Sequence, residues 1–170
     1  MPRHTADTGA PGVQIIPIHG PLSKRQSFLT MLFGGSATDD LSHELQSAMA
    51  SPAVGSIVLD VDSPGGGVSR IKELADQIYQ ASRQKRIVGV ANAQAGSAAY
   101  WLLSQCSEAV VRPSDDVGSV GVLSVHADQS RALDQAGIKV SVIKSAKHKA
   151  EGSPFESLSN DAREAYPIAC

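Results

Sequence analysis

The chain has 170 residues and a mass of 17.7 kDa, a size typical of one domain with one hydrophobic core. Hydrophobic residues make up 42% of the sequence and aromatic residues 4%, which excludes a disordered chain and predicts a core of Val, Ile, Leu and Ala. The net charge of −2 provides no strong positive field for nucleic acid or anionic lipid. Cys106 and Cys170 are too few for a disulfide scaffold, so we expect reduced thiols.

The two ends of the chain differ from its middle. Residues 1–12 are polar, rich in Gly and Pro, and lack the apolar run of a signal peptide. No stretch approaches the roughly 20 apolar residues of a membrane span. We therefore expect a mobile segment at 1–12, a single domain at 13–170 and no membrane span. A helical pattern begins at Asn160 and stops at Pro167, which suggests a domain truncated at its C-terminus.

The apolar residues change their period several times along the chain. Short β-branched runs predict strands at 13–18, 56–61, 87–91, 109–111, 120–125 and 140–144. Helical spacing predicts helices at 41–49 (with Thr38 or Asp39 as N-cap and Pro52 after its end), 71–79, 98–103, 130–135 (ending at Gly137) and from 160 onward. This alternation predicts an α/β fold of repeated βαβ units around a mainly parallel sheet.

A glycine-rich loop, DSPGGGVS at 62–69, lies between a predicted strand and a predicted helix. Three glycines allow positive φ angles and let backbone N–H groups approach a ligand closely, and the helix that follows adds a positive dipole end. The loop suits a phosphate or a developing oxyanion. It matches neither a P-loop nor a dinucleotide fingerprint, and its alternative is a plain strand-to-helix turn.

A second loop, QAGSAAYW at 94–101, places Ser97 between small residues at the start of a predicted helix. Small neighbours admit a substrate, and the helix dipole favours negative charge, so the position suits a nucleophile. The alternative is an ordinary N-cap serine. The sequence also differs from the G-x-S-x-G elbow, because Ala99 stands at the second glycine position.

A third loop, KSAKHK at 144–149, offers three lysines as general bases. A lysine acts as a base only when it is neutral, and neighbouring cations favour that form. Such a run is also typical of a solvated loop. His19 and His126 lie near predicted strand ends, so a Ser-His-Asp triad stays open. No paired Cys/His spacing or HExxH motif indicates a metal, and we expect no cofactor.

In this order, SPGGG, AGSAAYW, DDVGSVGV and IKSAKHKA make the chain resemble the signal peptide peptidase family of Ser-Lys proteases, most closely its phage capsid assembly branch. The resemblance spans residues 13–166. It implies the crotonase and Clp-protease fold. It also implies Ser97 as nucleophile, Lys149 as general base rather than Lys147, and Gly66 as the main oxyanion-hole residue with Gly65 and Gly67 beside it. The N–H of Ser97 is expected to be a second donor.

The resemblance further implies a serine endopeptidase that processes scaffold, portal or other capsid proteins, in the host cytoplasm or the phage prohead. It also implies a homo-oligomer, and five large apolar residues suggest its interface: Phe28, Leu29, Met31, Leu32 and Phe33. Three alternatives remain: a bacterial peptidase that degrades signal peptides, an acyl-CoA enzyme of the crotonase type, and an inactive structural capsid component.

Overall fold

The structure is a computed structural model that describes residues 11–26, 32 and 34–165. The chain divides into two compact units, Met1–Val120 and Gly121–Cys170, and each is described by itself. Two sequence predictions fall outside the described residues: the mobile N-terminal segment and most of the apolar patch at 28–33. Of that patch, only Leu32 is described, and its side chain is 63% exposed.

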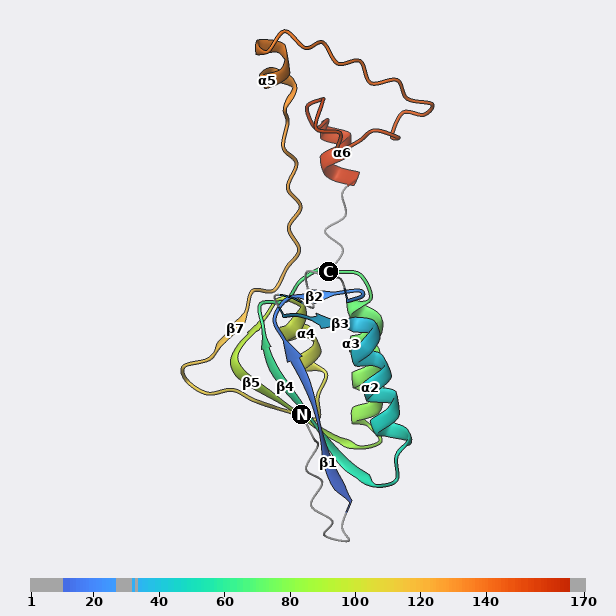
Figure 1. The fold of residues 1–170 in the computed structure, drawn as a ribbon, viewed down its shortest axis with the longest axis vertical. Coiled ribbons are helices and arrows are strands. Elements are labelled where there is room, and N and C mark those ends of the chain that lie inside the picture. Colours follow the sequence, from blue (N-terminus) through green and yellow to red (C-terminus); the bar gives the residue numbers. More distant parts are fainter. Residues whose placement is uncertain (1–10, 27–31, 33, 166–170) are drawn as a thin grey trace. The chain divides into compact units, whose positions relative to one another are not determined.

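The first unit is built on one parallel sheet (Figure 1). Its order is β1-β4-β5-β6, and the short strand β7 pairs with the end of β5. A separate parallel pair, β2-β3, lies between β1 and the first helix in sequence. The strands are β1 (Gly12–His19), β2 (Leu22–Ser23), β3 (Ser36–Ala37), β4 (Val54–Ser63), β5 (Arg86–Gly96), β6 (Glu108–Val110) and β7 (Asp116–Gly118).

Three helices cover one face of this sheet: α2 (Thr38–Ala50), α3 (Ile71–Ser82) and α4 (Ala98–Ser104). Alternate residues of β4, such as Ile57, Leu59 and Val61, are at most 2% exposed and join the helices in one core. On the opposite face Val13 and Ile15 of β1 are 60% and 58% exposed. This period of two is what half-buried strands require, and the predicted fold class is confirmed.

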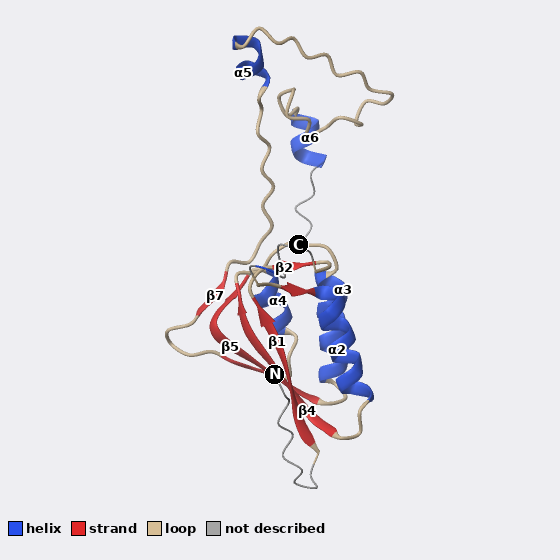
Figure 2. Ribbon diagram, viewed as in Figure 1, coloured by secondary structure: helices blue, strands red, loops and turns tan. Residues whose placement is uncertain are grey.

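The second unit contains α5 (Ser130–Gln135) and α6 (Asn160–Ala165), joined by loops (Figure 2). Both helices were predicted, and Gly137 takes the expected left-handed φ of 72° after α5. The predicted strands at 120–125 and 140–144 are wrong, because no strand is found among the described residues of this unit. Leu123 and Ile143 are instead 83% and 96% exposed. A pattern of apolar residues assigns side chains to the two faces of a strand. A strand forms only where a second strand also provides hydrogen bonds, and the pattern does not encode that partner.

Local chemistry explains two further differences in the first unit. The cap of α2 is Ala37 rather than Thr38 or Asp39, and no side chain caps this helix. Thr38 is instead buried inside the first turn, where its hydroxyl donates to the carbonyl of Lys24 at 3.4 Å. The strands β2, β3 and β7 were not predicted, since two or three residues carry no detectable period.

An irregularity in β5 precedes the serine turn. Between two paired positions, β4 advances from Val61 to Ser63 while β5 advances from Ala91 to Ala95. Ala93, inside this bulge, has a φ of 94°, a conformation that favours glycine. The Asp115 carboxylate holds the region: it accepts hydrogen bonds from the side chain and backbone of Arg112 and from Ala93, and these lower its pKa. Bulges re-aim a strand, and this one lies just before Ser97.

Candidate active site

The glycine-rich loop and the serine turn lie against each other in the first unit. A Cβ placed on Gly65 would lie 2.7 Å from the carbonyl oxygen of Gly96 and 2.8 Å from Cβ of Ser97. A Cβ on Gly96 would in turn lie 2.9 Å from the carbonyl oxygen of Pro64. Only glycine fits at either position, so these residues allow the two motifs to approach at backbone distance.

The backbone of Ser97 is held in an uncommon conformation. Its φ is 51° and its ψ is −118°, immediately before the first residue of α4. Its N–H donates to the carbonyl of Gly118 in β7 at 2.7 Å, and its C=O accepts the N–H of Trp101 at 3.1 Å. A non-glycine residue with such angles costs conformational energy, which the surrounding bonds must offset. Strain of this kind is typical of a nucleophile at a strand-to-helix turn.

One sequence expectation about this turn is wrong. The N–H of Ser97 was expected to be an oxyanion donor, but the carbonyl of Gly118 already accepts it. The next N–H, that of Ala98, begins α4 and belongs to the helical N–H groups that have no intrahelical acceptor. It lies 3.1 Å from the Cβ position built on Gly65. Ala98 was not considered from the sequence, although the residue after a nucleophile is a recurrent oxyanion donor.

The three glycines of the loop differ in their hydrogen bonds. The N–H of Gly65 donates to Oγ of Ser63 at 3.2 Å, and the N–H of Gly67 donates to the carbonyl of Leu22 at 3.0 Å. Gly66 is exposed, and its N–H makes no hydrogen bond to any described residue. A Cβ on Gly66 would lie 2.1 Å from the carbonyl oxygen of Leu22. Among these glycines, Gly66 therefore combines an available N–H with an absolute need for glycine.

Histidine makes a different contact in each unit. His19, at the end of β1, pairs through Nε2 with the Asp60 carboxylate at 3.1 Å. His126, in the second unit, has Nε2 at 3.2 Å from the carbonyl oxygen of Glu156. Among the described residues of the first unit, no hydrogen bond joins Ser97 Oγ to a histidine. A Ser-His-Asp triad therefore has no hydrogen-bonded form within that unit.

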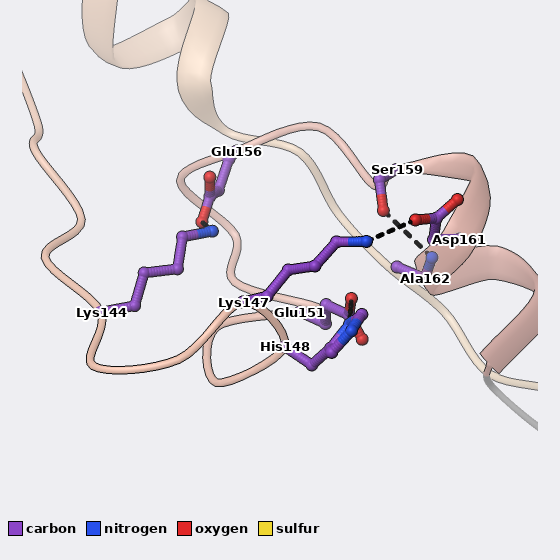
Figure 3. A network of polar contacts seen from close by, with 8 residues as sticks. All are labelled: Lys144, Lys147, His148, Glu151, Glu156, Ser159, Asp161 and Ala162. Carbon is purple, nitrogen blue, oxygen red and sulfur yellow. Dashed lines mark hydrogen bonds and ion pairs between the residues drawn. The ribbon is translucent and has the colours of Figure 1, made fainter.

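The lysine loop belongs to the second unit, and ion pairs occupy two of its three amines (Figure 3). Nζ of Lys144 lies 2.8 Å from Oε1 of Glu156, and Nζ of Lys147 lies 3.0 Å from Oδ2 of Asp161. The ammonium of Lys147 thereby lowers the pKa of Asp161. Lys149 is exposed, and no described residue forms a hydrogen bond or ion pair with its Nζ. Its backbone N–H donates to the carbonyl of Ala146, which forms a turn.

A second set of polar contacts holds the chain that follows this loop. Asp128 accepts hydrogen bonds from Oγ of Ser130 at 2.6 Å and from Oγ of Ser157 at 2.5 Å. These bonds lower the pKa of Asp128 to about 2. The backbone N–H of Gln129 donates to the carbonyl of Pro154 at 2.8 Å. The segment after the lysines is thus tied to the start of α5 within the same unit.

Other kinds of site find little support among the described residues. No group of three or more His, Cys, Asp or Glu side chains is placed to hold a metal ion there. Burial raises the pKa of the Cys106 thiol to about 12, which leaves it a protonated packing residue. No described helix has both the length and the apolar character needed to cross a membrane.

Comparison with protein families matches residues 79–167 to peptidase family S49. Two phage proteins are similar over 90% of the chain. The head-tail preconnector protein GP5 of Enterobacteria phage P21 is 35% identical, and the capsid assembly protease C of Escherichia phage lambda is 33% identical, each over 153 residues. The chain spans 30% and 35% of the length of these relatives, about a third.

A solved structure shares the fold at low sequence identity. It is a mutant of the 1510-N membrane-bound stomatin-specific protease in complex with a substrate peptide. The TM-score is 0.52 at 16% identity, over 68% of this chain and 48% of that one. At this identity the match supports the fold alone.

Proposed function

The chain belongs to peptidase family S49, and on that premise we propose that it is a serine endopeptidase with Ser97 as nucleophile and Lys149 as general base. The observation that carries the proposal is the packing of the serine turn on the glycine-rich loop. Ser97 lies against Gly65, and the N–H groups of the residues that follow these two, Gly66 and Ala98, have no acceptor among the described residues. Acyl transfer requires a hydroxyl and available N–H donors in one site, so this packing supports the proposal.

In the proposed mechanism, neutral Lys149 accepts the proton of Ser97 Oγ as this oxygen attacks the peptide carbonyl. The N–H groups of Gly66 and Ala98 donate to the oxyanion of the tetrahedral intermediate. The C–N bond then breaks, the lysine proton passes to the leaving amine, and Ser97 stays acylated. Water, deprotonated by Lys149, attacks the acyl group and releases the carboxylate product and the serine.

The choice of Lys149 among the three lysines rests on their partners. The amines of Lys144 and Lys147 are engaged in ion pairs with Glu156 and Asp161. Lys149 has no such carboxylate among the described residues. A base must give up its proton near neutral pH, so the unpaired amine is the best suited of the three.

We further propose that the substrates are phage head proteins, such as a scaffold or portal protein, and that the enzyme acts as a homo-oligomer in the prohead or host cytoplasm. Two phage relatives, a head-tail preconnector protein and a capsid assembly protease, support this class of substrate. Light scattering tests the oligomer, since a monomer would give a mass near 17.7 kDa.

A fluorophosphonate probe tests the catalytic proposal without a known substrate. Its phosphorus accepts Ser97 Oγ, and fluoride leaves. We expect mass spectrometry to locate one adduct on Ser97 in the wild type and none in Ser97→Ala. Absence of labelling in a folded wild type would contradict the proposal. Co-expression with candidate scaffold and portal proteins, comparing wild type with Ser97→Ala, then identifies the cleaved substrate.

A further inference from the structure

Ser63 is a buried polar residue that joins three segments around the proposed oxyanion hole. It ends β4 and is 0% exposed. Its hydroxyl donates to the carbonyl of Gly20, in the turn after β1, at 2.6 Å. The same oxygen accepts the N–H of Gly65, in the glycine-rich loop, at 3.2 Å. One hydroxyl therefore connects the ends of two strands to the loop that carries Gly66.

These bonds determine which loop N–H stays available. Ser63 engages the N–H of Gly65, while Leu22 donates to the carbonyl of Gly65 at 2.8 Å and accepts the N–H of Gly67 at 3.0 Å. Leu22 thus fixes the peptide groups on both sides of Gly66, and Ser63 fixes the peptide group that precedes them, between Pro64 and Gly65. The N–H of Gly66 is left without an acceptor among the described residues. An oxyanion donor acts best when it is held in place before the reaction begins.

We propose that Ser63 is a positioning residue for catalysis: its hydroxyl holds the Gly65 peptide so that the Gly66 N–H faces the oxyanion. The inference rests on the proposed function and adds a residue to it that does not touch the substrate. If the Gly65 N–H lost its acceptor, the left-handed turn at Gly65, with φ of 93°, would be free to relax. The Gly66 donor would then move away from Ser97.

The chain contains a matched control for a purely structural role. Ser36 makes the same kind of bridge nearby: its Oγ accepts the N–H of His19 at 2.9 Å and donates to the carbonyl of His19 at 2.9 Å. Ser36 thus joins β3 to the end of β1 without a bond to the glycine-rich loop. Ser63→Ala and Ser36→Ala each remove one hydroxyl that makes two backbone hydrogen bonds.

The experiment measures the second-order rate of Ser97 labelling by a fluorophosphonate, together with thermal stability, in the full chain. We expect Ser63→Ala to lower the rate about 10- to 100-fold, the range expected when a reacting group is displaced by up to an ångström. Ser36→Ala should stay within about threefold of the wild type, the small change expected where no reacting group moves. The pH at which labelling is half-maximal should be the same in wild type and Ser63→Ala, because Ser63 acts on the oxyanion side and not on the base.

Equal labelling rates in Ser63→Ala and Ser36→Ala would overturn the inference while leaving the proposed function intact. A wild type that does not label at Ser97 would contradict the proposed function itself. Ser63→Cys keeps the buried volume with weaker hydrogen bonds, and it should show a smaller rate loss in the same direction if the alanine variant is unstable. In the wild type, NMR should show slow amide exchange for Gly65 and fast exchange for Gly66.

Discussion

The two units stabilise their proposed catalytic groups in different ways. In the first unit, backbone hydrogen bonds hold the serine turn to Gly118 and the glycine-rich loop to Leu22, and both rest on a core whose members are at most 8% exposed. In the second, Ala162 is the only buried residue among residues 121–164, and ion pairs between exposed or half-buried side chains hold the lysine loop. The segments that carry Ser97 and Gly66 are therefore held by backbone hydrogen bonds and packing, whereas the lysine loop depends on charge.

This difference matters because backbone contacts and exposed ion pairs respond to different perturbations. A glycine with no space for a Cβ cannot be replaced without moving main chain. An exposed ion pair contributes little and is screened by salt. We therefore expect single substitutions near Ser97 to change activity strongly, and substitutions of the lysine-loop carboxylates to change it weakly.

The largest effect is expected at Ser97. Ser97→Ala removes the proposed nucleophile and should lower proteolysis and probe labelling by more than about 10³-fold, the size of loss that removal of a catalytic serine causes in serine proteases. Thermal unfolding should change little, since Ser97 Oγ makes no hydrogen bond to a described residue. Ser104→Ala, at the other end of α4, is the matched control and should keep full activity. Proteolysis retained by purified Ser97→Ala would assign the nucleophile elsewhere.

Lysine substitutions test whether the second unit supplies the base. Lys149→Ala should be as inactive as Ser97→Ala. Lys149→Arg should also be inactive, because a guanidinium does not release its proton near neutral pH and so cannot act as a base. Lys144→Ala and Lys147→Ala serve as controls and should lose less than about tenfold, since each removes only an exposed ion pair. The wild-type labelling rate should rise with pH.

A histidine base would give the opposite pattern. Lys149→Ala would then stay active, and His19→Ala or His126→Ala would not. His19 is the better placed of the two for such a role, because its imidazole already has an acidic partner in Asp60. An inactive His19→Ala would move the base from the charged loop of the second unit to the sheet of the first.

Substitutions of two neighbouring glycines test whether activity depends on the N–H of Gly66 in particular or on the glycine-rich loop in general. A Cβ on Gly66 would lie 2.1 Å from the Leu22 carbonyl oxygen, whereas a Cβ on Gly67 would meet nothing within 4 Å. Gly66→Ala should therefore displace the donor and lower kcat about 10²- to 10³-fold. Gly67→Ala, one residue away, should keep nearly wild-type kcat. Comparable losses in both variants would show that the loop as a whole, rather than Gly66, is what activity requires.

The sequence predicted the first unit better than the second for a physical reason. Long β-branched runs and helical stripes are read directly from spacing, and they gave β1, β4, β5 and the helices around them. The family resemblance assigned Gly65 and Ser97 to one site, and the structure brings their loops together at the ends of the neighbouring strands β4 and β5. The hydrogen bond from the N–H of Ser97 to the carbonyl of Gly118 was not expected, because it depends on β7, whose three residues show no detectable period.

In the second unit, predicting strands from short apolar runs failed, because a strand depends on hydrogen bonds to a partner strand. The runs at 120–125 and 140–144 alternate as strands do, yet the described chain gives them no ladder. The contacts that do hold the lysine loop, such as Lys147 with Asp161, join residues 14 positions apart through flexible side chains. No periodicity in a single sequence encodes such pairs.

The smallest expected effect is a change of the second unit in acid. The pKa of Asp128 is lowered to about 2, first by the hydroxyl of Ser130 and then by that of Ser157, from an ordinary value of 3.8. Because the folded pKa is below the unfolded one, the stabilisation is complete above about pH 4 and is lost as the pH falls towards 2. The NMR amide shift of Gln129, which donates to Pro154, should follow this loss.

Asp128→Asn removes the titrating group, so the same shift should become independent of pH between 4 and 2. Asp134→Asn is the matched control, because Asp134 lies on α5 and its carboxylate makes no hydrogen bond to a described residue. This control should keep the wild-type pH profile. In the first unit, the amide of Gly67 should change little over this range, since its loop is held by Leu22 and Ser63 and not by a carboxylate such as Asp128. If the amide shifts of Gly67 and Gln129 changed equally between pH 4 and 2, the proposed difference between a unit held by backbone hydrogen bonds and a unit held by charged groups would be wrong.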